Sequence, residues 1–110
     1  MRTPFVACAV VALSAALSST GAFPADADAG RQKATACAVC HGPLGLSMRP
    51  DAPSLAGQPE IYLVAQLRAY RSGARHHEIM NVIAKPLSDD DIVQLAAWYA
   101  SIKVEAVAPR

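Results

Sequence analysis

The chain has 110 residues, a formal net charge of +1 and 53% hydrophobic residues. This length allows one domain at most, and the near-neutral charge gives no support for nucleic-acid binding through bulk electrostatics. Part of the apolar content is concentrated at the N-terminus, so the overall percentage does not describe the folded part of the chain.

The N-terminus predicts an export signal at residues 1–22. An arginine near the start precedes an apolar run of 13 residues, Phe5–Leu17, and a stretch of small residues follows this run. The run is shorter than the roughly 20 residues that a membrane-spanning helix needs. Cleavage is expected after residue 22, or as late as residue 27. We therefore expect a periplasmic protein with no stable membrane insertion after signal cleavage, and an uncleaved N-terminal anchor is the alternative.

Cleavage would leave one small domain, which we place at residues 28–104. A core of this size often needs a cofactor or a cross-link for stability. Cys8 would leave with the signal, so Cys37 and Cys40 would be the remaining thiols. Two cysteines so close in sequence form no disulfide framework.

The first predicted helix spans about residues 27–38. Asp26 or Asp28 can cap its first turn, because a carboxylate there accepts the free backbone N–H groups. Residues 42–58 are rich in glycine and proline and predict an irregular loop. A loop this long is unusual in so small a domain unless it packs on something, which indicates a large ligand beneath it.

Two more helices are predicted in the second half of the chain. One begins near Pro59 and ends at Gly73, and residues 74–87 form a second loop. The last begins at Ser88, which forms a short version of the capping box with Asp91. Its apolar stripe consists of Ile92, Leu95, Ala96, Tyr99 and Ile102. The predicted fold class is all-α, with three principal helices and long loops.

The chemistry-bearing motif is Cys37-x-x-Cys40-His41, the attachment signature of haem c. Two thiols on one face of a short helical turn can form thioether bonds with the two vinyl groups of a porphyrin, and the adjacent histidine can bind its iron. A redox disulfide would be expected in a thioredoxin-like βαβ context, which the pattern lacks. A zinc site needs two more ligands, and His76 and His77 are too close in sequence to complete it with both rings. We favour one covalently attached haem c.

A haem iron with one histidine ligand has an open sixth position. The candidates in this sequence are Met48, His76, His77 and Met80. Met48 lies only seven residues after His41, whereas Met80 lies 39 residues after it, just before the last helix. We expect Met80 to be the ligand, and a histidine there would lower the reduction potential relative to methionine.

The sequence resembles the single-haem class I cytochromes c, and is most similar to the small bacterial c-type cytochromes related to one half of the dihaem class I proteins. Three segments in order carry the resemblance, which covers nearly the whole mature chain: CAVCHG at 37–42, PSLAGQPEIYLVAQLRAYRSG at 53–73 and MNVIAKPLSDDDIVQLAAWYASI at 80–102. It implies the cytochrome c fold, in which three principal helices and long loops wrap around one haem c.

The resemblance also implies a role for each site residue. Cys37 and Cys40 would be the thioether attachment points, with His41 as the proximal iron ligand and Met80 as the distal one. Pro53 would accept the Nδ1–H of the histidine through its carbonyl oxygen, which fixes the ring and raises its donor strength. Leu55 would pack on the same side of the haem.

The terminal helices are expected to cross, with Gly30 permitting a close approach and Trp98 or Tyr99 at the contact. The implied function is one-electron transfer by low-spin iron between redox partner proteins, a dehydrogenase or reductase donor and an oxidase or reductase acceptor, without enzymatic activity. The alternatives are a haem-bearing subunit of a periplasmic dehydrogenase or oxidoreductase complex, and a five-coordinate haem enzyme or gas sensor.

Overall fold

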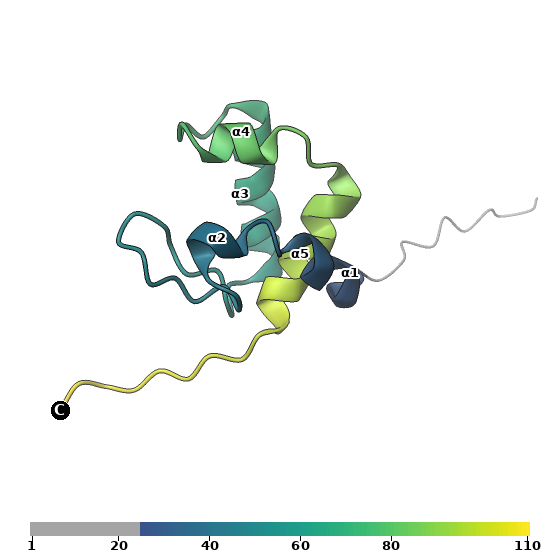
Figure 1. Ribbon diagram of the computed structural model, residues 1–110. Helices are drawn as coiled ribbons and strands as arrows, with labels where there is room; N and C mark the ends of the chain where they lie inside the picture. Colours follow the sequence, from purple (N-terminus) through teal and green to yellow (C-terminus); the bar gives the residue numbers. More distant parts are fainter. Residues whose placement is uncertain (1–24) are drawn as a thin grey trace, which may run out of the picture.

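The computed structural model describes residues 25–110 as five helices joined by loops (Figure 1). The predicted export signal lies outside these residues. The helices are α1 (Ala27–Lys33), α2 (Ala38–His41), α3 (Glu60–Ser72), α4 (Met80–Ala84) and α5 (Asp89–Ser101). The described range contains no strand, so the predicted all-α class is confirmed. None of the helices in this range is long and apolar enough to cross a membrane.

The two terminal helices, α1 and α5, pack directly against each other (Figure 1). The contact passes over Gly30, which is buried. A Cβ atom added at Gly30 would overlap with the backbone oxygen of Gln94 and would lie 2.9 Å from Cβ of Trp98. The predicted close approach at Gly30 is therefore confirmed, and Trp98 supplies the side chain at this contact.

The hydrophobic core lies along the inner face of α5. Leu95, Ala96 and Tyr99 form one cluster with Leu63 of α3 and Ala34. Burial of this face gives α5 its place between α1 and α3, because α5 contacts both helices. The predicted apolar stripe is confirmed, although its last member, Ile102, lies just beyond the helix and is only partly buried.

Three predicted helix ends are present. Ser88 and Asp91 form a full capping box at α5, since the Ser88 hydroxyl accepts from the Asp91 N–H and the Asp91 carboxylate accepts from the Ser88 N–H. Asp26, rather than Asp28, caps α1 by accepting from two backbone N–H groups. Gly73 ends α3 in the left-handed conformation, with a φ of 82°.

The prediction of one helix over residues 27–38 was wrong in its length, because α1 ends at Lys33. The Thr35 hydroxyl donates to the backbone oxygen of Gln32 at 2.9 Å. From Thr35 to Cys37 the backbone N–H groups bond three residues back, so the chain tightens into a turn before α2 begins. The predicted loop at residues 74–87 also contains a short helix, α4, that the sequence reasoning missed.

Arginine side chains join the end of α3 to the start of α5. Arg71 donates to the backbone oxygen of Leu87 at 2.9 Å and to the Asp89 carboxylate at 2.6 Å. Arg68 lies 3.7 Å from the same carboxylate. The bond with Arg71 lowers the pKa of Asp89 below its ordinary value. These two arginines thus have structural partners within the chain.

Candidate haem attachment site

The short helix α2 carries the two thiols. Cys37 stands immediately before the helix and Cys40 lies within it. Both are free cysteines of intermediate burial. The backbone N–H groups of Cys40 and His41 donate to the Cys37 oxygen at 3.2 and 3.0 Å, so the motif forms one helical turn. Side chains three residues apart on such a turn lie on the same face. Two attachment points on one planar group need this arrangement.

His41 ends α2 and is only 8% exposed. Its Nδ1 lies 2.7 Å from the backbone oxygen of Pro53, the bond implied by the resemblance. A carbonyl oxygen only accepts, so Nδ1 carries the proton and Nε2 keeps its lone pair. Within residues 25–110 Nε2 makes no hydrogen bond. The ring is therefore held by one nitrogen and can bind a metal ion through the other.

Backbone hydrogen bonds hold the loop at residues 42–58 in place. The Leu55 N–H donates to the Gly45 oxygen at 2.7 Å, and the Gly57 N–H donates to the Tyr99 oxygen at 2.9 Å. The side chain of Leu55 packs against the core cluster. These bonds fix the part of the loop that contains the carbonyl partner of the histidine.

Met80 begins α4 and is half-buried. Its N–H donates to Nδ1 of His77 at 3.3 Å. The next residue, Asn81, accepts from the His77 N–H at 2.6 Å and donates to the backbone oxygens of Tyr70 and Arg75 at 2.7 and 2.8 Å. The start of α4 is thereby fixed to the end of α3, by contacts separate from those that hold α2.

The other candidate ligands lie in more open positions. Met48 is 98% exposed on the loop at residues 42–58, whereas Met80 is half-buried. His76 and His77 are exposed, and Nδ1 of His77 is engaged by the Met80 N–H. Burial therefore favours Met80 among the four.

Cys37 lies in an apolar environment beside Tyr99. Burial raises the pKa of the Cys37 thiol, and the neighbouring Tyr99 hydroxyl lowers it in part. Burial also raises the pKa of Tyr99. The Tyr99 hydroxyl is buried and makes no hydrogen bond to nitrogen or oxygen in the described residues. Both groups are neutral at physiological pH, so this side of the motif is uncharged.

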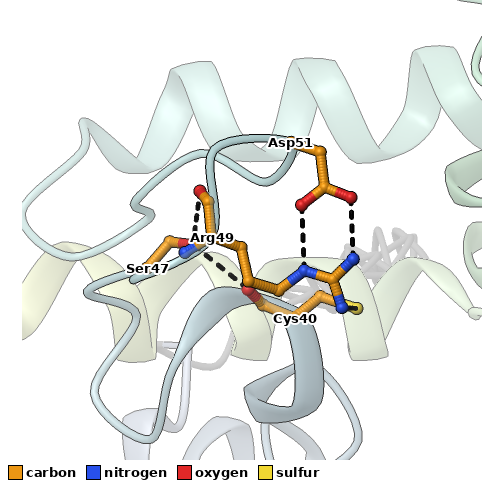
Figure 2. Close-up of polar contacts among 4 residues, drawn as sticks. All are labelled: Cys40, Ser47, Arg49 and Asp51. Atoms are coloured by element: carbon orange, nitrogen blue, oxygen red, sulfur yellow. Dashed lines mark hydrogen bonds and ion pairs between the residues drawn. The ribbon is translucent and has the colours of Figure 1, made fainter.

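Cys40, in contrast, lies beside a charged pair that the sequence reasoning did not find (Figure 2). Nε and Nη2 of Arg49 donate to the two carboxylate oxygens of Asp51 at 2.9 and 2.7 Å. Nη1 of Arg49 lies 3.9 Å from the Cys40 sulfur. Ser47 joins the loop to the motif by donating to the Cys40 backbone oxygen at 3.2 Å.

Several apolar side chains of the described residues remain largely uncovered, and this fits a large apolar group. They lie on the loop after the motif and in or next to α4: Leu44, Leu46, Ile79, Val82 and Ile83. No three His, Cys, Asp or Glu side chains of residues 25–110 come together as a metal site. Paired thiols on one helical turn and a buried imidazole with a free nitrogen are the groups that the covalent attachment of a haem c needs.

The cytochrome c family model matches residues 27–103, and the chain belongs to this family. It is 42% identical over 79 residues to cytochrome c-554(548) of Halomonas halodenitrificans, covering 69% of this chain and 95% of that protein. It is 43% identical over 84 residues to the thiosulfate dehydrogenase electron acceptor of Thiomonas intermedia, covering 74% of this chain and 38% of that protein.

Solved structures give the same fold. The crystal structure of reduced recombinant cytochrome c4 from Pseudomonas stutzeri matches with a TM-score of 0.67 and 39% identity, covering 71% of this chain and 46% of that one. The chain thus spans about half the length of this relative. The predicted cytochrome c fold and the resemblance to one half of the dihaem proteins are confirmed. The protein carries haem c covalently, one group for its one family domain, and transfers electrons.

Proposed function

We propose that the chain is an exported carrier of single electrons in which Cys37 and Cys40 would hold the haem through thioether bonds, with His41 and Met80 as the iron ligands. The observation that supports it most is the 2.7 Å bond from His41 Nδ1 to the Pro53 oxygen, beside two free thiols on the same helical turn. This bond leaves Nε2 of His41 unprotonated, and the Pro53 carbonyl on the loop at residues 42–58 fixes the orientation of the ring.

Each residue has a stated task in this proposal. The Pro53 carbonyl orients the His41 ring and makes its free nitrogen a stronger donor. Cys37 and Cys40 would each hold the haem through a thioether bond to one vinyl group, with the thiol proton passing to the other vinyl carbon. Met80 offers an uncharged sulfur, which favours the ferrous state. The haem supplies an iron that takes up and releases one electron without a vacant position for substrate.

Redox partner proteins follow from the family, and we propose a periplasmic dehydrogenase or reductase as the donor and an oxidase or reductase as the acceptor. The name of the Thiomonas intermedia relative, a thiosulfate dehydrogenase electron acceptor, supports a dehydrogenase as donor. The second candidate is a haem-bearing subunit of such a complex, and the likeness of the chain to 22% of a longer thiosulfate dehydrogenase chain from Marichromatium purpuratum supports it. Co-sedimentation of the native protein with a larger assembly would favour the second candidate, and free sedimentation as a monomer would favour the first.

Export belongs to the proposal as well. Residues 1–22 have the composition of a signal, and the family model begins to match only at residue 27. Mass spectrometry of the periplasmic fraction measures signal cleavage and covalent haem attachment in one experiment. We expect the mass of the chain without residues 1–22, or without residues 1–27, plus one covalently bound haem. A colourless product with free thiols would refute the proposal.

The axial ligands are tested by substitution of Met80. Replacement of Met80 by alanine removes the sulfur, so the iron should accept added imidazole or CO, and the long-wavelength band of methionine-ligated ferric haem should disappear. Met48→Ala is the matched control, because Met48 is 98% exposed and should change neither property. A Met80→Ala protein that keeps the parent spectrum and refuses both ligands would show that another residue fills the sixth position.

A further inference from the structure

The pair formed by Arg49 and Asp51 has a fixed orientation relative to the Cys40 sulfur. The guanidinium uses one edge for the carboxylate and directs its remaining nitrogen, Nη1, to the sulfur at 3.9 Å (Figure 2). Arg49 therefore lies between Asp51 and Cys40, and the positive charge is the nearer of the two. Ser47 holds the Arg49 backbone next to the Cys40 backbone. Its hydroxyl oxygen accepts from the Arg49 N–H at 3.1 Å, and the hydroxyl donates to the Cys40 backbone oxygen at 3.2 Å.

We propose that Arg49 and Asp51 set the reduction potential of the haem as a pair of opposed charges at its Cys40 attachment. The inference rests on the proposed attachment of haem to Cys40. Reduction adds one electron and lowers the charge of the site by one, and no bond to either residue forms or breaks. A nearby cation favours the reduced state and a nearby anion the oxidised state, with an energy that falls with distance and with the local dielectric constant.

The pair is charged on both sides at neutral pH. The bond with Arg49 lowers the pKa of Asp51 below its ordinary value, and the same bond raises the pKa of Arg49. Their side chains are 49% and 60% exposed, so dissolved ions reach them. The effect on the potential must therefore depend on ionic strength, since the screening length falls from about 10 Å at 0.1 M salt to about 3 Å at 1 M.

The experiment is a spectroelectrochemical titration of the purified holoprotein and its Arg49→Gln, Asp51→Asn and double variants. Asp51→Asn leaves the cation unopposed and should raise the midpoint potential. Arg49→Gln leaves the anion unopposed and should lower it. The double variant should return close to the parent. At low salt we expect each single change to alter the reduction equilibrium a few-fold, where tenfold corresponds to about 59 mV for one electron, and 1 M salt should shrink both shifts.

Midpoint-potential shifts of opposite sign in Arg49→Gln and Asp51→Asn are the result that a merely structural role of the pair would not produce. Shifts of the same sign in both single variants, or no shift at low salt, would overturn the inference. Arg31→Gln and Asp90→Asn are the matched controls, since Arg31 lies over the Trp98 ring and Asp90 in the first turn of α5. They change charge by the same amount away from the loop and should shift the potential much less.

Two further measurements separate this inference from the proposed function. Mass and absorption spectra show first whether each variant carries covalent haem. Absence of haem from the parent protein would overturn the proposed function, whereas a loaded parent whose variants have unchanged potentials would overturn only the role of the pair. If Arg49→Gln does not load, Arg49→Lys keeps the charge without the two-pronged bond. Its potential should stay near the parent, and a large fall would overturn a role for charge.

Discussion

Asn81 should control how firmly Met80 is held, and its replacement by alanine is the most direct test of the site's geometry. The Asn81 amide joins three backbone groups that no other side chain of the described residues connects: the oxygens of Tyr70 and Arg75, at 2.7 and 2.8 Å, and the N–H of His77, at 2.6 Å. Without the amide, the segment from the end of α3 to the start of α4 loses three of its hydrogen bonds.

The size of the effect follows from these bonds. A hydrogen bond contributes about 1 kcal/mol net to stability, and three bonds therefore give an upper value of about 3 kcal/mol. The bond to Tyr70 is partly buried, while those to Arg75 and His77 are exposed and can be replaced by water. We expect Asn81→Ala to lower the free energy of unfolding by about 1.5–3 kcal/mol, or the melting temperature by roughly 4–8 °C per kcal/mol.

Thermal unfolding of the holoprotein, followed by circular dichroism, measures the stability. The long-wavelength band of methionine-ligated ferric haem and the uptake of added imidazole report on Met80 in the same samples. Glu78→Ala is the control, because Glu78 is exposed on the same segment and should change stability by less than about 0.5 kcal/mol. An Asn81→Ala protein that melts like the parent and keeps an undiminished band would refute the argument.

Two other changes test the framework around the site. Gly30→Ala places a Cβ against the backbone of α5 at Gln94 and should lower the free energy of unfolding by about 1–3 kcal/mol. Gln32 is exposed on the same helix, so Gln32→Ala should have little effect. Equal melting temperatures for the two variants would contradict the close packing at Gly30. The ion pair with Lys33 lowers the pKa of Asp91 to about 2, so its stabilisation is complete above about pH 4 and lost as the pH falls toward 2. Asp91→Asn should reduce the fall in melting temperature between pH 4 and pH 2. If the melting temperatures of the variant and the parent fall in parallel over this range, the ion pair makes no such contribution.

Features that depend on neighbouring residues could be predicted from the sequence. The capping box at Ser88 uses a residue three places away, and the motif of α2 places its thiols within one turn. The close approach of the terminal helices at Gly30 could be predicted because the resemblance already implied that these helices cross. The Pro53 partner of His41 came from the same resemblance, since a separation of twelve residues through an irregular loop gives no periodic signal.

The rest depends on the path of the loops in space. Arg49 lies nine residues from Cys40 in sequence and Asn81 lies eleven from Tyr70, so neither contact follows from helical spacing. The early end of α1 depends on one hydroxyl, that of Thr35, taking a backbone oxygen that a continuing helix would have used. Composition gave no indication of which of these local bonds would form.

The contacts of α4 have a consequence for how the protein opens. Among the helices of residues 25–110, α4 packs against α3 alone, whereas α5 packs against both α1 and α3 (Figure 1). His41 and its carbonyl partner are fixed through α2 and a loop tied to the end of α5, and Met80 is fixed through the last turn of α3. Because α4 has a single helix partner in this range, a local fluctuation that opens α4 can displace Met80 while α1, α3 and α5 keep their contacts and His41 stays bonded to Pro53.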